Sequence, residues 1–358
     1  MTDPKRQRLL TFRSGGWVIL LTVFVGVVVV AMTVIPAWQR MQARPPGDGR
    51  DPATYGFALE PTLVPRASIV AGQLHRDLVP ALVTPAVLPA DGVGEANRRQ
   101  RGKYLVGSDR VIGVEVAGES RAYPILVLSL HEIVNDELGG VPIAITYNPL
   151  CDSVVVFERR LDPGSEPLEF GVSGLLYNSN LLLYDRRADG DESLWSQLQH
   201  RAIAGPYAAA GATLRLVPAE LGRWDDWSTR HPETTVIDFA PESLARYRET
   251  SYASYLRSDE LLFPVDPPPP PDGPPAKTPC VIVDAGGVCR VYPIPAVIAA
   301  ADADGLWEDT LGPATLQFHA RSAPDLVRVT VGGEAATTRY ALWFAAHALG
   351  RGCERAGE

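Results

Sequence analysis

The sequence predicts an α+β fold with mainly antiparallel sheets and short helices, internally duplicated and preceded by one transmembrane helix. Three observations lead to this prediction. An uncharged apolar stretch lies near the N-terminus, and similar motifs lie on both sides of a proline-rich run. Short strand patterns also mix with helical ones, without the regular βαβ alternation of a doubly wound parallel sheet.

Composition indicates a folded chain that does not bind nucleic acid. Of 358 residues, 46% are hydrophobic and 21% charged, which is enough apolar material for a core. The net charge is -9 and the pI about 5.3. Nucleic-acid binding needs clustered Lys and Arg to neutralise phosphates, so we expect no such partner.

The first element is a predicted transmembrane helix over residues 17–38, in which no residue is charged. A helix of this length rises roughly 33 Å, and a hydrocarbon core is about 30 Å thick. A cleaved signal peptide would have a shorter apolar region and a small-x-small cleavage site, which residues 35–37 match poorly. We therefore expect an uncleaved signal-anchor.

Charge on either side of this span predicts its orientation. Four basic residues precede the span and three follow it, the latter mixed with Asp48 and Asp51. The positive-inside rule then places residues 1–16 in the cytoplasm as a tail. The expected localisation is the cell membrane, single-pass, with the bulk of the chain extracytoplasmic.

Two segments rich in proline are expected to be connectors. Residues 39–66 are rich in Pro, Gly, Arg and Asp and are predicted to form a flexible tether. Residues 266–279 read DPPPPPDGPPAKTP, a stiff polyproline spacer that cannot join a sheet. The folded part is thus expected to divide into a first repeat with a middle segment, 67–265, and a shorter second repeat, 280–358.

The two repeats begin with matching hairpins. Residues 111–124 read VIGVEVAGESRAYP and residues 280–293 read CVIVDAGGVCRVYP, each a strand, a turn and a strand ending in Arg-x-Tyr-Pro. An apolar helical stretch follows each hairpin, then an Asp-x-Leu-Gly turn at 136–139 or 309–312, then two further strands. In the middle segment, 167–240, we expect strands at LEFGVSGLL, LLLYDRR and TLRLVPA, and helices at ESLWSQL and ELGRWDDWSTRH.

The first repeat contains the side chains that can carry chemistry: His131, Glu132, Asn135, Asp136, Asn148 and Cys151. On a helix His131 and Asn135 would share a face, and the turn fixed by Pro149 would bring Cys151 close to that helix. Imidazole, carboxylate and thiolate together can ligate a transition metal or form a base-activated nucleophile. The second repeat lacks the counterparts of His131 and Cys151, which favours a site. The structural alternative is that His131 caps a helix and Cys151 is a small buried apolar residue.

The chain resembles a family, the bacterial and archaeal domain of unknown function 3179, from about residue 74 onward. The resemblance rests on VIGVEVAGESRAYPI, LHEIVNDELGGVPIAITYNPLC, FGVSGLLYNSNLLLYDR, SLWSQL, AIAGP and WDDWSTRHPET. It implies an extracytoplasmic, often lipid- or membrane-anchored protein with no established activity. Members of the family commonly have Cys at the position of Asn148, so the departure here removes a dithiol at that turn.

Three functional hypotheses remain open at this point. The first is metal- or redox-linked binding at the cluster, with a transition metal as the cofactor. The second is an enzyme with Cys151 as nucleophile and His131 as base, and the third is a non-catalytic scaffold with an envelope protein as partner. No disulfide is expected, because a two-residue turn at 286–287 pairs Cys280 with residue 293 and Cys289 with residue 284.

Overall fold

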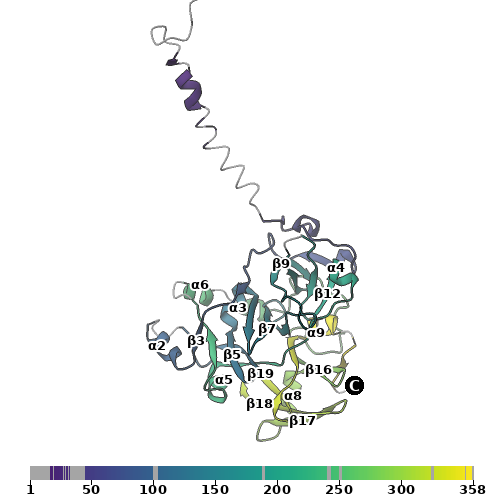
Figure 1. Ribbon diagram of the computed structural model, residues 1–358. Coiled ribbons are helices and arrows are strands. Elements are labelled where there is room, and N and C mark those ends of the chain that lie inside the picture. Colours follow the sequence, from purple (N-terminus) through teal and green to yellow (C-terminus); the bar gives the residue numbers. More distant parts are fainter. Residues whose placement is uncertain are drawn as a thin grey trace, which may run out of the picture. The chain divides into compact units, whose positions relative to one another are not determined.

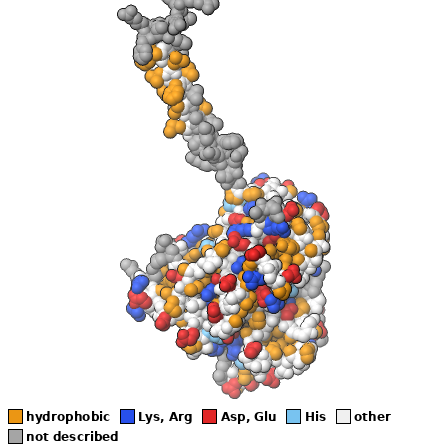
Figure 2. All heavy atoms as spheres, viewed as in Figure 1, with side chains coloured by type: hydrophobic (Ala, Val, Ile, Leu, Met, Phe, Trp, Pro, Cys, Tyr) orange, Lys and Arg blue, Asp and Glu red, His pale blue; other side chains and the backbone are white. Residues whose placement is uncertain are grey.

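The computed structural model describes residues 17–18, 20–26, 28, 30, 32, 45–99, 104–187, 190–239, 243–249, 252–323, 326–350 and 352–356. The chain divides into two units, Met1–Pro46 and Gly47–Glu358. In the first unit, the described residues between 17 and 32 are helical, and their exposed side chains are mostly apolar (Figure 2). Within the described positions, no helix is long and apolar enough to cross a membrane. The expected cytoplasmic tail and much of the expected span lie outside these positions.

The second unit combines antiparallel sheets with short helices, as predicted (Figure 1). Among the described strands, parallel pairing is confined to β2–β6, β5–β14 and β16–β22. The helices are α2 (Gly92–Arg99), α3 (Ile125–His131), α4 (Pro206–Ala209), α5 (Trp224–Arg230), α6 (Leu244–Glu249), α7 (Ala253–Arg257), α8 (Ile294–Ala300) and α9 (Trp343–Leu349), with 3-10 turns η2 (Pro52–Tyr55) and η3 (Arg66–Ser68).

The first predicted hairpin lies at the centre of a five-stranded sheet. The strand order is β13 (Ala219–Arg223), β4 (Arg110–Val116), β5 (Glu119–Pro124), β14 (Thr235–Ile237) and β3 (Val87–Pro89). Ala117 and Gly118 both have positive φ in the two-residue turn. Such turns match the right-handed twist of the strands that they join.

The second hairpin belongs to an eight-stranded sheet that contains strands of both repeats. Its order is β2 (Leu82–Val83), β6 (Ile133–Leu138), β7 (Val141–Asn148), β8 (Ser153–Glu158), β21 (Thr338–Leu342), β15 (Pro279–Ala285), β16 (Val288–Pro293) and β22 (Glu354–Arg355). The link between β8 and β21 is the pair Val154–Tyr340. Strands from the two predicted repeats therefore share one sheet, within one compact unit.

Two smaller sheets complete the unit. One contains β1 (Ile69–Ala71), β9 (Phe170–Tyr177), β10 (Asn180–Asp185), β11 (Leu194–Ser196) and β12 (Arg201–Ala204). The other contains β17 (Leu306–Leu311), β18 (Ala314–Ala323), β19 (Leu326–Val331) and β20 (Glu334–Ala335). In the first of these sheets, every residue of β9 and β10 is buried, including the polar Ser173, Asn180 and Asp185.

The two hairpins have equivalent neighbours. The first strand of each pairs antiparallel with a later strand, β13 beside β4 and β21 beside β15. The second strand of each pairs parallel with a strand that follows a helix, β14 beside β5 and β22 beside β16. Each hairpin also continues into a helix and then three antiparallel strands, β6–β7–β8 or β17–β18–β19.

Three predicted helical segments have another structure. The helix after the first hairpin ends at His131, and residues 133–138 form β6, so His131 and Asn135 do not share a helix face. The β-branched pair Ile133–Val134 favours a strand, and Glu132 interrupts the helix with φ of 54°. The segment ESLWSQL contains strand β11, and the predicted helix from Glu220 begins only at Trp224.

The hairpin register is as predicted, but the chain does contain a disulfide. Cys280 pairs with Pro293 and Asp284 with Cys289, so Cys280 and Cys289 cannot be bridged. Cys289 is instead bonded to Cys353, 64 residues further on. The expectation of no disulfide was therefore wrong, because the parallel pairing of β22 with β16 brings distant residues together. Local spacing around the turn carries no information about that pairing.

Candidate functional site

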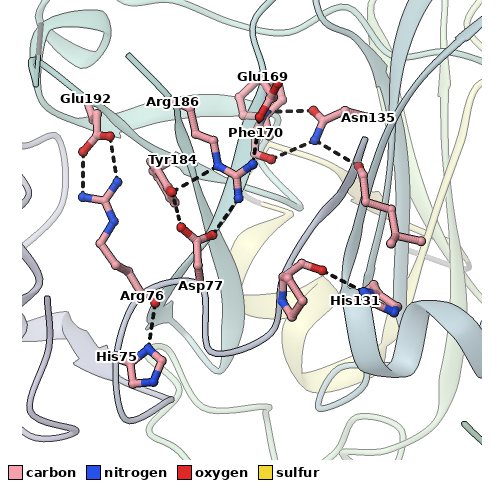
Figure 3. Close-up of polar contacts among 12 residues, drawn as sticks. His75, Arg76, Asp77, His131, Asn135, Glu169, Phe170, Tyr184, Arg186 and Glu192 are labelled. Atoms are coloured by element: carbon pink, nitrogen blue, oxygen red, sulfur yellow. Dashed lines mark hydrogen bonds and ion pairs between the residues drawn. The ribbon is translucent and has the colours of Figure 1, made fainter. Parts of the chain in front are cut away.

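His131 ends α3 and is held by two hydrogen bonds. Its Nδ1 lies 2.8 Å from the carbonyl oxygen of Pro80, and its Nε2 lies 2.9 Å from the hydroxyl of Tyr247 in α6. In Figure 3 the ring of His131 lies apart from the ion pairs around Arg76 and Arg186. Burial lowers the pKa of the imidazole. Both ring nitrogens thus connect separate segments of the fold.

Asn135 and Asp136 have structural partners as well. The Asn135 amide donates to the carbonyl oxygen of Phe170 and accepts from its N–H, both at 2.8 Å, which joins β6 to β9 (Figure 3). The Asp136 carboxylate accepts from Arg121 at 2.7 Å and from the hydroxyl of Tyr123 at 2.9 Å. Both side chains are buried, and buried polar groups of this kind need such partners.

The Asn148–Cys151 turn is built from local hydrogen bonds. The side-chain oxygen of Asn148 accepts from the N–H of Leu150 at 2.8 Å, which closes the turn. The fully buried thiol of Cys151 donates to the carbonyl oxygen of Ser179 at 3.1 Å. Burial raises the pKa of this thiol, so the nucleophilic thiolate is disfavoured. The hydrogen bonds of His131 and Cys151 go to different partners, and the base–nucleophile pair expected from the sequence has no hydrogen bond to support it.

Glu132 differs from the other candidates because its carboxyl is buried without a cationic partner in the described part of the chain. It accepts one hydrogen bond, from the Gln73 amide at 3.3 Å. Burial raises the pKa of this carboxyl to about 8. Its φ of 54° is rare for a residue with a side chain. A neutral carboxylic acid at this position can donate a hydrogen bond as well as accept one.

The described residues contain no group of three or more His, Cys, Asp or Glu side chains that could hold a metal ion. The cluster predicted from the sequence is dispersed because its helix ends at His131. The following residues alternate between the two faces of β6, as successive strand residues do. The arrangement does not provide the ligand set that the metal hypothesis requires.

A polar cavity of about 420 Å³ lies elsewhere, where the two repeats meet. Three parts of the fold line this cavity. Strands β4 and β13 contribute Glu115 and Glu220, α5 and the residue after it contribute Trp227, Arg230 and His231, and β19 contributes Arg328 and Thr330. Here the sheet that contains β4 and β13 lies against β19. We call this space the inter-repeat cavity.

The charges in the inter-repeat cavity are unequally paired. The nearly buried Glu220 accepts a short hydrogen bond from Arg230, which also contacts Asp226 at 3.0 Å. Arg328 reaches Glu220 only at 3.9 Å, and it forms no hydrogen bond with a residue that the structure describes. Burial and the nearby Arg230 charge lower the pKa of Arg328. Arg328 thus lines the cavity, and its N–H donors have no hydrogen-bond acceptor among the residues that the structure describes.

The surroundings of His231 favour the neutral form of its ring. Its Nε2 lies 3.3 Å from a guanidinium nitrogen of Arg230, and its Nδ1 lies 3.4 Å from Glu115. A guanidinium can only donate, so Nε2 accepts and Nδ1 carries the proton. The ring stacks on Trp227, with centroids 3.9 Å apart, and burial lowers its pKa. The imidazole is thus fixed as part of the cavity wall.

The inter-repeat cavity was not foreseen from the sequence. The WDDWSTRHPET motif contains Trp227, Arg230 and His231 and was recognised, but as a mark of resemblance. Arg328 lies in DLVRVTV, which reads as an ordinary strand. Because the cavity joins residues from opposite ends of the chain, local spacing gives no signal for it.

Together these features define an α+β protein in which two hairpins have equivalent strand neighbours, a polar cavity is lined by both parts of the chain, and the thiol of Cys151 is buried. The chain belongs to the family described as protein of unknown function (DUF3179), whose model matches residues 76–347. The resemblance inferred from the sequence motifs is thereby confirmed. Neither the curated proteins nor the solved structures contain a match to this chain.

Proposed function

We propose that this protein is a membrane-anchored, extracytoplasmic binding protein whose inter-repeat cavity takes a small ligand that carries a carboxylate. The main support for this proposal is that Arg328 lines the cavity. The guanidinium lines the cavity, and its closest acidic partner is 3.9 Å away. A planar guanidinium matches a carboxylate with two parallel hydrogen bonds, which a point charge cannot do.

The surroundings of Arg328 support a bound ligand more than a folding role. Glu220 already accepts a hydrogen bond from Arg230, so Arg328 is not the main partner of that buried carboxylate. The exposed Glu115 and Glu334 lie at the same cavity and would attract a positive group on the ligand. An amino acid or another small zwitterion fits both sets of charges.

Succinate and glycine are suitable probes. We expect millimolar concentrations to raise the thermal midpoint of the full-length protein in detergent, since a ligand that binds only the native state stabilises it. Arg328→Gln should abolish this increase. Arg160→Gln, at an exposed position outside the cavity, should retain it. No increase for the unchanged protein, or an equal increase for Arg328→Gln, would overturn the proposal.

The membrane location is also part of the proposal. Residues 17–38 are the proposed anchor, on the hydropathy of the sequence. The Cys289–Cys353 disulfide supports an extracytoplasmic site for the second unit, because disulfides persist in oxidising compartments and are rare in the cytosol. Reporter fusions after residue 60 test this location: activity of a reporter that works only in the cytoplasm would reverse the orientation.

Internal duplication is proposed for the origin of the two halves. In the first, Asp136 accepts from Arg121 and Tyr123. In the second, Asp309 accepts from Arg290 and Tyr292 at 2.8 Å each. The equal strand neighbours of the two hairpins support the same origin. An experimental structure in which the two hairpins had different neighbours would refute it.

A further inference from the structure

An open apolar groove runs along α8 in the second half of the molecule. It has a volume of about 650 Å³ and is lined by Ala296, Val297 and Ala300 of α8, by Trp307, and by Thr278 before β15. Ala296 and Ala300 are exposed, although their side chains are apolar. We call this space the α8 groove.

The equivalent position in the first half is filled by helix α6. Helix α6 packs on α3, which is the counterpart of α8 (Figure 1). Tyr247 of α6 reaches His131 at the end of α3, at 2.9 Å. Arg248 pairs with Asp109, just before the first hairpin, at 2.6 Å. Two of the contacts of α6 are therefore with the end of α3 and with the residue before the hairpin.

The same two positions in the second half line the open groove. Because Val111 pairs with Pro124 and Cys280 with Pro293, the hairpins align without a gap. This register equates His131 with Ala300 and Asp109 with Thr278. Both Ala300 and Thr278 lie at the α8 groove. The α8 groove thus lies at the position equivalent to the one that α6 fills in the first half.

We propose that the α8 groove binds an amphipathic helix of a partner protein, in the manner in which α3 binds α6. The helix would present an aliphatic and an aromatic side chain three residues apart, as Leu244 and Tyr247 are, both of which are buried. Replacement of His131 by Ala at the equivalent position removes a polar contact and leaves room for a larger apolar group. This proposal does not depend on ligand binding in the inter-repeat cavity.

A synthetic peptide with the sequence of residues 236–249, which includes α6, is the probe. We expect saturable binding of the fluorescein-labelled peptide to the full chain in lipid nanodiscs, with a change in Trp307 fluorescence. Ala300→Arg should weaken binding about tenfold or more, because it places a charge in the apolar groove. Ala299→Arg, at a neighbouring exposed position outside the groove lining, should leave binding unchanged. Circular dichroism would establish that both variants are folded.

Several outcomes would overturn this proposal. One is the lack of saturable binding, and another is equal affinity of the two arginine variants. A peptide with Ser in place of both Leu244 and Tyr247 should bind at least about tenfold more weakly, and equal binding would exclude recognition of the helix face. Self-association that Ala300→Arg abolishes, or uptake of a fatty acid in place of the peptide, would assign the groove to another occupant.

Discussion

The hydroxyl of Tyr123 lies 2.9 Å from the carboxylate of Asp136, and the same carboxylate accepts from Arg121. Asp309 has the equivalent partners Arg290 and Tyr292, but its side chain is 28% exposed where that of Asp136 is 3% exposed. The same types of side chain are thus present in two environments, and Arg290 also pairs with Glu354, at 2.5 Å. Asp309 is therefore both more exposed than Asp136 and less essential to the charge of its arginine.

Asp136→Ala should destabilise the protein strongly, because it leaves the Arg121 charge half-buried and the Tyr123 hydroxyl buried without an acceptor. Loss of one partner of a buried pair costs about 3–5 kcal/mol. Asp309→Ala should cost about 1 kcal/mol, since water can replace the lost carboxylate there. Urea unfolding of full-length variants measures both free energies. Equal losses would contradict the argument from burial.

Cys151 should be unreactive in the native protein. Burial raises the pKa of its thiol, so little thiolate forms at neutral pH, and the side chain has no exposed surface. We expect iodoacetamide to leave Cys151 unmodified until the protein is unfolded, as judged by mass spectrometry. Cys280, also buried and with a raised pKa, provides the internal comparison. Rapid modification of Cys151 alone would revive the nucleophile hypothesis.

Reduction of the Cys289–Cys353 bond should destabilise the second half. The bond closes a loop of 64 residues, and disulfides typically contribute about 2–4 kcal/mol by restricting the unfolded chain. We expect two additional thiols after reduction under denaturing conditions and a lower thermal midpoint. Cys353→Ser should reproduce the lower midpoint without a reductant. An unchanged thiol count would show that the bond is not formed.

Glu132 should make stability fall as the pH rises. Its folded pKa of about 8 lies above the usual glutamate pKa of 4.5, so the folded state holds a proton that the unfolded state has lost between these pH values. The contribution of Glu132 to the free energy of unfolding is complete below pH 4.5. It is lost progressively up to about pH 8, by at most about 1.4 kcal/mol per pH unit.

The isosteric Glu132→Gln variant cannot ionise and should remove this dependence. The gain in unfolding free energy of the variant over the unchanged protein should be larger at pH 8 than at pH 5. Urea unfolding of both proteins at the two pH values measures this gain. The Gln73 hydrogen bond can persist in the variant, because an amide oxygen also accepts. A stability difference that does not change with pH would mean that Glu132 is ionised in the native state.

The amino-acid sequence by itself determined the class of fold, the two hairpins with their register, and the family. These depend on short-range chemistry: alternation of apolar residues predicts strands, and a two-residue turn fixes the pairing of Cys280 with residue 293. The end of α3 at His131 was not predicted, because an apolar run fits a helix and a buried strand equally well.

Only the tertiary structure decided which side chains meet. It separated the hydrogen bonds of His131 from those of Cys151 and paired Cys289 with Cys353. It also placed Arg328 opposite Glu220, and it left the α8 groove open where the first half has α6. Each of these contacts joins segments that are distant in the chain, and their formation depends on how the sheets pack. Local residue patterns do not contain that information.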